Sequence, residues 1–328
     1  MPDTAFLQSL IPSLFSKELA RLATSTYGMY GENRRSSLAA LYDTLQTEFG
    51  MKDDSVFLDL GSGRGVPSLL LALMRPKIIS LGMEIDASSF YLSLRQQLHF
   101  AKNIVQSREE ANPPPLRIAF GKGDCTALDT FEPATHIYTF DVGMPADVMI
   151  SFVEIANVTR TLTAFCCFRG DLVEEFGLDG TLAARLPMSM HGSNERHTCY
   201  LYRMNDKHQD HHHMPVQQGG GRSGLCEGPS VAQLAAFARQ GEGEQISVLE
   251  GLVETWLAPA AVSRPLRRCR TTITSPSPPP AATQVTKNAE RKQRRKTGTT
   301  VSGRGTSVGA TERGGRATGR RGRAKATP

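Results

Sequence analysis

The 328-residue sequence has no uninterrupted apolar run of 18 residues, the length that a membrane-spanning helix needs. Its first ten residues contain an acid and no basic cluster, so we expect no secretory signal. The six cysteines include no C-x-x-C pair, and the adjacent Cys166 and Cys167 lie in an apolar run. We therefore expect reduced, mostly buried thiols and an intracellular protein.

Charge is distributed unevenly, although the net formal charge is only +6. Residues 264–328 carry 17 Lys and Arg and two acidic side chains, a net charge of +15, whereas the first 263 residues carry 21 basic and 30 acidic side chains, a net charge of −9. This asymmetry indicates an anionic partner for the tail. Its basic clusters at 291–296 and 320–325 suit phosphate binding or nuclear import. The alternative is a solvated tail without a task.

Strand and helix patterns alternate through the middle of the chain. Strands are expected at 55–60, 78–83, 116–120, 135–140, 162–168, 182–190 and 197–204, with helices at about 5–23, 36–49, 66–74, 87–108, 145–157 and 171–177. This alternation predicts an α/β fold with a doubly wound parallel sheet. The last two strands have no helix between them, which predicts an antiparallel hairpin at the sheet edge.

Composition divides the chain into four parts. Residues 1–50 form an N-terminal helical cap with a loop, and residues 51–204 form the α/β domain. Residues 205–262 are a polar linker with possible short helices between 230 and 257. Its histidines lack cysteines or placed carboxylates, so we expect no metal site. Residues 263–328 are dominated by Pro, Ser, Thr, Gly and Arg, which cannot bury a core, so this tail is expected to be disordered.

The most informative stretch is residues 57–65, Phe-Leu-Asp-Leu-Gly-Ser-Gly-Arg-Gly, where a strand enters a glycine loop. The glycines allow a tight turn and let a ligand lie against the backbone. Asp59 ends this strand and Glu84 ends the next one, where an acid can accept both hydroxyls of a ribose. The stretch therefore indicates a nucleoside site. The alternative is a glycine-rich turn without a ligand.

The spacing D-x-G-x-G-x-G differs from the G-x-G-x-x-G of dinucleotide sites. The acid before the glycines would repel a pyrophosphate but suits a cationic ligand with an amino group. The spacing resembles the first motif of class I S-adenosylmethionine (SAM)-dependent methyltransferases. Seven strands ending in a hairpin also fit the methyltransferase sheet rather than the six-stranded dehydrogenase sheet. We therefore expect that fold class, with SAM as cofactor.

Further motifs resemble the disruptor-of-telomeric-silencing (DOT) class of histone H3 lysine methyltransferases, which are not SET-domain enzymes. Tyr30-Gly31-Glu32-Asn33 resembles the family's Y-G-E loop, and Asp59-Leu60-Gly61-Ser62-Gly63 matches its D-L-G-S-G. Gly82-Met83-Glu84, Gly123-Asp124-Cys125 and Tyr200-Leu201-Tyr202 are similar to its G-V-E, G-D-F and Y-L-H. The resemblance covers about residues 20–204. Y-G-E upstream of D-L-G-S-G is fairly specific, whereas many methyltransferases share D-L-G-S-G.

The resemblance implies a set of cofactor-binding residues. They are Tyr30, Gly31, Glu32, Asn33, Phe57, Leu58, Asp59, Leu60, Gly61, Ser62, Gly63, Arg64, Gly65, Val66, Glu84, Asp124 and Cys125. Asp124 would accept from the adenine amino group, Glu84 would hold the ribose, and Tyr30 and Glu32 would close over the cofactor. Asp141 and Tyr200 are the candidate catalytic residues, because they would line the lysine channel.

Two of these positions depart from the family pattern. Cys125 replaces an aromatic residue that would cover the adenine ring, and Asp141 stands where the family has asparagine. The segment 140–145, Phe-Asp-Val-Gly-Met-Pro, looks most like the trypanosomatid branch. Structural alternatives are a helix cap for Asp141, a turn residue for Asp124 and a strand aromatic for Tyr200.

We therefore expect a nuclear enzyme that methylates a lysine in the globular core of histone H3 within nucleosomes. Its partners would be the nucleosome and, through residues 264–328, DNA, with no membrane and no metal. One alternative is an RNA methyltransferase with a basic nucleic-acid-binding tail, which predicts [D/N]-P-P-[Y/F] where this sequence reads Asp-Val-Gly-Met. A non-catalytic chromatin-binding module would have a damaged cofactor loop, and this loop is intact.

Overall fold

The computed structural model describes residues 5–14, 32–107, 113–190, 196–206 and 228–257. All of them belong to the first of two compact units, which comprises residues 1–266. The expected disordered tail and the histidine-rich stretch lie outside the described residues. No helix in the described part is long and apolar enough to cross a membrane.

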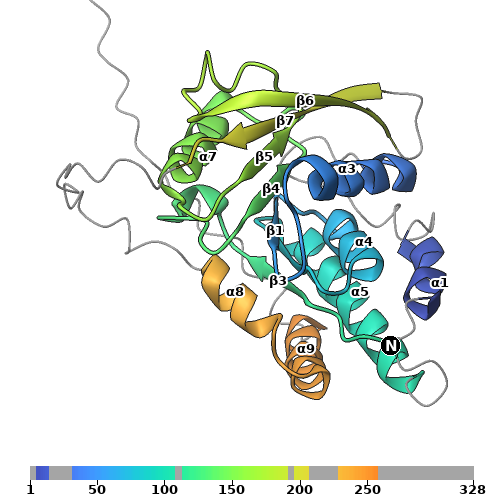
Figure 1. Ribbon diagram of the computed structural model, residues 1–328. Coiled ribbons are helices and arrows are strands. Elements are labelled where there is room, and N and C mark those ends of the chain that lie inside the picture. Colours follow the sequence, from blue (N-terminus) through green and yellow to red (C-terminus); the bar gives the residue numbers. More distant parts are fainter. Residues whose placement is uncertain (1–4, 15–31, 108–112, 191–195, 207–227, 258–328) are drawn as a thin grey trace, which may run out of the picture. The chain divides into compact units, whose positions relative to one another are not determined.

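A seven-stranded sheet with the order β3-β2-β1-β4-β5-β7-β6 forms the centre of this unit (Figure 1). The strands are β1 (Val56–Leu60), β2 (Ile79–Glu84), β3 (Ile118–Lys122), β4 (His136–Thr139), β5 (Ala164–Cys167), β6 (Gly180–Ser189) and β7 (Arg196–Met204). The first five strands are parallel, and β7 is antiparallel to both β5 and β6. This is the sheet of class I SAM-dependent methyltransferases, so the expected fold class and edge hairpin are confirmed.

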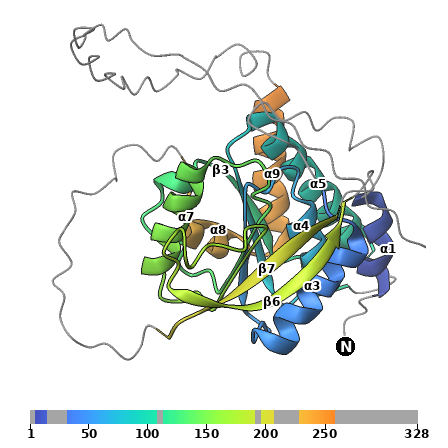
Figure 2. The same cartoon turned by 90° about the horizontal axis from the view of Figure 1, so that it is seen from above.

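Helices cover both faces of the sheet (Figure 2). One side has α1 (Ala5–Leu14), α3 (Arg35–Glu48), α4 (Val66–Met74), α5 (Ala87–Gln106) and α9 (Glu242–Leu257), and the other has α7 (Ala146–Val158), α8 (Val231–Phe237) and the short 3-10 helix η1 (Cys125–Ala127). The sheet thus separates two apolar cores, because side chains alternate between its faces. Phe57 packs in one core, and its neighbour Leu58 packs in the other.

Two expected helices differ from the structure. The described part of the first, α1, ends at Leu14 and includes Pro12 without a break; residues 15–23 lie outside the described ranges. The helix expected near 171–177 is wrong, because the structure has only turns there. One helix-like bond, from Glu175 N to Asp171 O, is followed by a wider one from Leu178 N to Leu172 O. A segment this short does not offset the cost of helix nucleation.

The motif residues lie at the carboxyl ends of the parallel strands, so they are close together at one end of the sheet. Asp59 in β1 is in register with Gly82 of β2 and with Tyr138 of β4. The hydroxyl of Thr139 at the end of β4 donates to Leu60 O at 3.0 Å. The glycine loop therefore begins between two fixed strand ends, which is where open α/β sheets bind ligands.

Candidate functional site

The glycine loop turns sharply between β1 and α4. Gly61 and Gly63 have φ of +73° and +55°, a region that side chains rarely adopt. The backbone N–H groups of Gly61 and Ser62 both donate to Met83 O, at 3.0 and 2.9 Å. A Cβ atom on Gly61 would also come within 3.0 Å of the Met144 methyl group. The turn thus needs glycine and lies against the end of β2.

Glu84 is buried at the end of β2 and bonded to the loop. Its Oε2 accepts from Gly63 N and its Oε1 accepts from Asp86 N, both at 2.7 Å. Burial raises the pKa of Glu84, although these backbone bonds act in the opposite direction. Each carboxylate oxygen keeps further acceptor capacity. The carboxylate is therefore oriented by the backbone and still suited to accept from two hydroxyl groups.

Asp59 is only 2% exposed. Its Oδ2 has no hydrogen-bond partner among the described residues, and neither has the buried hydroxyl of Ser62. Burial raises the pKa of Asp59, and the nearby Glu84 carboxylate raises it further. An unpaired buried carboxylate is costly and favours a donor or cationic ligand. The amino group and sulfonium of SAM meet this requirement, so the residues present fit that cofactor.

Glu32 lies beside the glycine loop, bound to Arg64. The Arg64 side chain is fully buried, and its Nε and Nη2 donate to the two carboxylate oxygens of Glu32, the latter at 2.6 Å. Bidentate pairs of this kind fix geometry as well as charge. Both residues were expected to contact the cofactor, and the structure pairs them with each other. Tyr30 and Gly31 lie outside the described residues.

Asn33 and Arg34 join the same segment to the hairpin. The Asn33 amide donates to the Tyr138 hydroxyl at 2.7 Å, and Arg34 N donates to Ser189 O at 2.7 Å. The Arg34 guanidinium also donates to Met190 O at 2.8 Å. The Asn33 bond thus ties this segment to β4, and the Arg34 bonds tie it to the end of β6.

Asp124 and Cys125 follow β3 at the neighbouring strand end. Asp124 Oδ1 accepts from the Thr126 backbone at 2.9 Å and from its hydroxyl at 2.7 Å, which matches the turn alternative. Cys125 is buried, and burial raises the pKa of its thiol, which disfavours the reactive thiolate form. Cys125 and the other described cysteines, Cys166, Cys167 and Cys199, are free and buried.

Four of the expected cofactor residues have buried apolar side chains. These are Phe57, Leu58, Leu60 and Val66, which pack in the two cores. They would offer a ligand mainly backbone atoms. Gly65 has a packing reason of its own, since a Cβ atom there would come 2.3 Å from the Phe120 ring.

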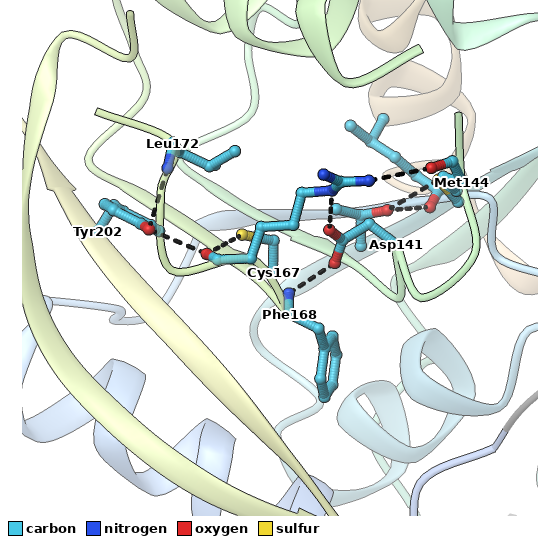
Figure 3. A network of polar contacts seen from close by, with 9 residues as sticks. Asp141, Met144, Cys167, Phe168, Leu172 and Tyr202 are labelled. Carbon is cyan, nitrogen blue, oxygen red and sulfur yellow. Dashed lines mark hydrogen bonds and ion pairs between the residues drawn. The ribbon is translucent and has the colours of Figure 1, made fainter. Parts of the chain in front are cut away.

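Asp141 is buried at the end of β4, in the polar network of Figure 3. Its Oδ1 accepts from Phe168 N at 2.5 Å, and its Oδ2 lies 3.3 Å from Arg169 Nε. Burial raises the pKa of Asp141, while the Phe168 N–H and the Arg169 guanidinium oppose the shift. Helix α7 has Pro145 at its N-cap without a side-chain bond, so Asp141 ties two strand ends together instead of capping that helix.

Tyr200 pairs with Cys167 across β5 and β7. Its ring lies against Gly170, where a Cβ atom would come within 2.7 Å, and the Arg185 guanidinium lies 5.9 Å from the ring centroid. The next tyrosine along the face, Tyr202, donates its hydroxyl hydrogen to Arg169 O at 2.9 Å and accepts from Leu172 N (Figure 3).

Arg169 and an aromatic cluster were missed by the sequence reasoning. Arg169 Nη2 donates to Met144 O at 3.1 Å, which joins the post-β5 turn to the post-β4 turn. Phe140, Phe168 and His197 pack edge to face, with ring centroids 4.8 to 6.1 Å apart. The position of Arg169 directly after a predicted strand was a usable signal. The ring cluster, in contrast, depends on the packing of three separate strands.

Comparisons with known proteins bear on the family. Residues 11–106 match the family model described as "Histone methylation protein DOT1". This stretch includes Glu32, the glycine loop and Glu84, and it confirms the resemblance to the DOT class there; the trypanosomatid branch stays a prediction. No curated protein matches the sequence. Within the described ranges, no group of three or more His, Cys, Asp or Glu residues could hold a metal.

Solved structures give only distant similarity. TrmN from Thermus thermophilus is 15% identical, with 52% of each chain covered and a TM-score of 0.38. Precorrin-6y C5,15-methyltransferase from Geobacter metallireducens is 14% identical over 57% of this chain and 95% of that one, with a TM-score of 0.37. A SAM-dependent methyltransferase from Geobacter sulfurreducens, in complex with S-adenosylhomocysteine, is 14% identical over 53% and 75%, with a TM-score of 0.34. The chain thus spans about half the length of TrmN.

Proposed function

We propose that this SAM-dependent methyltransferase is a histone-lysine N-methyltransferase acting on the globular core of histone H3 in nucleosomes. The observation that carries the proposal is the match of residues 11–106 to a histone methylation family. That stretch contains the buried acid Asp59, whose Oδ2 has no hydrogen-bond partner in the part of the chain that the structure describes, and this suits a cationic methyl donor. The solved structures do not bear on the substrate, because their similarity is too distant.

The proposed cofactor site uses residues from three strand ends. Glu84 and Asp124 would hold the nucleoside, while Asp59 and the loop glycines would surround the methionine portion. Bound SAM supplies an electrophilic methyl group on a sulfonium centre. The chain's own task is then to align an acceptor nitrogen and exclude water.

A lysine must arrive without its proton to act as a nucleophile. The rings of Phe140 and Phe168 are partly exposed beside Asp141, at the end of the sheet where β4 and β5 finish. An apolar wall there would lower the pKa of an ammonium group by desolvation, so that no strong general base is needed. Asp141 and Tyr200 are our candidates for residues that orient the lysine.

The tail would serve the same reaction from outside the site. Residues 264–328 have a net charge of +15 and the remainder of the chain −9. A tail of this charge would bind DNA phosphates without sequence preference and hold the acidic body near a histone surface. We propose a nuclear location on the same grounds.

A transfer assay with three substrates tests the proposal. The purified full chain is mixed with methyl-labelled SAM and either nucleosomes, free histones or RNA. Label in histone H3 of nucleosomes is expected. Recovery of the label as methyl-lysine after acid hydrolysis of the histone would identify lysine as the acceptor. Label only in RNA would support the RNA methyltransferase alternative. SAM binding without transfer to any of the three would indicate a non-catalytic module.

A further inference from the structure

The connection from β3 to β4 lacks a covering helix. Residues 123–135 contain only the three-residue η1 before β4 begins. The face of β2 and β3 on that side carries Leu81, Met83 and Ala119, which are all buried. Apolar strand residues of this kind need a covering layer. In this protein the layer comes from α8, which follows the last strand of the sheet in sequence (Figure 1).

β3 and α8 fit one another closely. Val231, Leu234 and Ala235 of α8 are buried in the same core as Ala119. Gly121 leaves the space that α8 needs, since a Cβ atom there would come 2.9 Å from both Pro229 and Leu234. Such spacing requires small residues on the strand and fixes the helix against it.

The start of α8 is also fixed. Ser230 and Gln233 form a capping box, with Ser230 N donating to the Gln233 side chain at 2.8 Å and Gln233 N donating to the Ser230 hydroxyl at 3.2 Å. The following helix α9 packs on α5, where Lys102 Nζ lies 2.6 Å from Glu250 Oε1 and Leu249 is buried. Both ends of the segment 228–257 are thus attached to the fold.

Gly228 brings this segment to the candidate cofactor site. A Cβ atom on Gly228 would lie 2.5 Å from Lys122 O and 3.0 Å from the Cα of Gly123. Gly123 N in turn donates to Glu84 O at 3.0 Å. One backbone contact and one hydrogen bond therefore separate Gly228 from the acid expected to hold the ribose. Asp124 and Cys125 follow directly in the chain.

We propose that residues 228–238, an adenine-end wall, position the Gly123-Asp124-Cys125 turn for the nucleoside of SAM. The wall takes the place of the absent crossover helix, and its Gly228 is a positioning residue that acts through Gly123. The inference rests on the proposed cofactor site. It means that SAM affinity depends on a segment beyond the last strand.

Two glycine variants of the full chain test this role. Gly228→Ala introduces a methyl group where backbone atoms already lie, so the wall must move from Gly123. Gly243→Ala in α9 is the control, because a Cβ atom there meets nothing within 4 Å. By calorimetry we expect Gly228→Ala to weaken SAM binding about tenfold, as for one lost buried hydrogen bond, and Gly243→Ala to leave it unchanged. Unchanged SAM affinity in a folded Gly228→Ala protein would overturn the inference.

Hydrogen exchange on the unmodified protein decides the case if Gly228→Ala does not fold. Saturating SAM should slow exchange in 228–238 and leave exchange in the second half of α9, 250–257, unaffected. Bound SAM without any change in 228–238 would overturn the wall alone. A wild-type chain that does not bind SAM would instead overturn the proposed cofactor site, and the inference with it.

Discussion

Glu84 Oε2 accepts a hydrogen bond from Gly63 N at 2.7 Å, which joins the end of β2 to the middle of the glycine loop. Gly63 has a φ of +55°, a conformation that glycine adopts without strain, so the bond forms within a turn that favours glycine. Glu84 thus orients the loop at the same time as it presents acceptor oxygens to a ligand. In the proposed cofactor site, a change at this residue would therefore alter both the loop and the affinity for the nucleoside.

Replacement of Glu84 by alanine should weaken SAM binding. A buried charge-assisted hydrogen bond contributes about 1.5–3 kcal/mol, so a loss of at least about tenfold in affinity is expected. Calorimetry on Glu84→Ala measures it, with the exposed Glu174→Ala as control. Unchanged SAM affinity in a folded Glu84→Ala protein would show that this carboxylate does not hold the nucleoside.

SAM binding should strengthen as pH rises through the mildly acidic range. In the free protein, burial raises the pKa of both Asp59 and Glu84. A fraction of the molecules therefore carries a protonated carboxyl group at a pH where an exposed acid is fully ionised. A cationic ligand with hydroxyl donors favours the ionised forms and lowers these pKa values, so binding releases protons.

Calorimetry in buffers of different ionisation enthalpy measures that proton release. Asp59→Asn is the matched variant, because it keeps the shape of the side chain and removes one titrating group. The release should be smaller in this variant. A SAM affinity that does not vary with pH in the wild type would contradict the linkage.

The positions of the strands could be read from the sequence, whereas long-range pairings could not. Short apolar runs located β1 and β2, and the ends of these strands placed Asp59 and Glu84 at the same end of the sheet. The pairing of Glu32 with Arg64 involves a charged side chain within a glycine loop, and nothing local indicates its partner. The packing of α8 on β3 could not be predicted either. Ala119 and Gly121 leave space for a helix, but nothing in the local sequence indicates that this helix is α8, more than 100 residues later in the chain.

The stability that the neutral His136 contributes should be lost between pH 6.5 and about pH 4. Burial lowers the pKa of His136 from 6.5 to about 4, and its Nε2 lies 3.1 Å from Phe49 O. In this window the unfolded chain binds a proton that the folded chain does not, so stability decreases as pH falls. The loss amounts to about 3 kcal/mol over the full window.

Denaturant unfolding at pH 7 and pH 5 checks the contribution of His136. The variant His136→Gln keeps a polar side chain without titrating, so on going from pH 7 to pH 5 the wild type should lose stability relative to this variant. The acids with raised pKa values act in the opposite direction and are common to both proteins. Equal pH dependence in the two proteins would exclude His136 as the cause.

Tyr200 should affect turnover more than cofactor binding. Its ring is held between Gly170 and Arg185, beside the turn that carries Arg169. Tyr200→Ala removes this packing, and a misplaced substrate channel lowers turnover by about ten- to a hundredfold. SAM affinity should stay near normal, because the residue would contact substrate rather than cofactor. Steady-state kinetics on nucleosomes test this prediction, with Tyr200→Phe as the variant that keeps the ring. Full turnover in Tyr200→Ala would show that Tyr200 serves only in packing.

Salt dependence should reveal whether the basic tail binds nucleosomal DNA. Residues 264–328 carry 17 Lys and Arg, and each phosphate that they neutralise releases a counterion. Affinity for nucleosomes should therefore fall as salt rises. The logarithm of the binding constant should decrease with the logarithm of the salt concentration, with a slope of about 0.9 per phosphate contacted. The truncated chain 1–263 separates the tail from the cofactor site. It keeps α9, which ends at Leu257, so its SAM affinity should match that of the full chain. The nucleosome affinity of the truncated chain should be lower, and its salt slope should be flatter. A full-length protein with the basic residues of 291–296 replaced by serine separates charge from length and should behave as an intermediate. Equal nucleosome affinities and slopes in all three proteins would mean that the acidic body finds its histone unaided, and that the tail has a different role such as import.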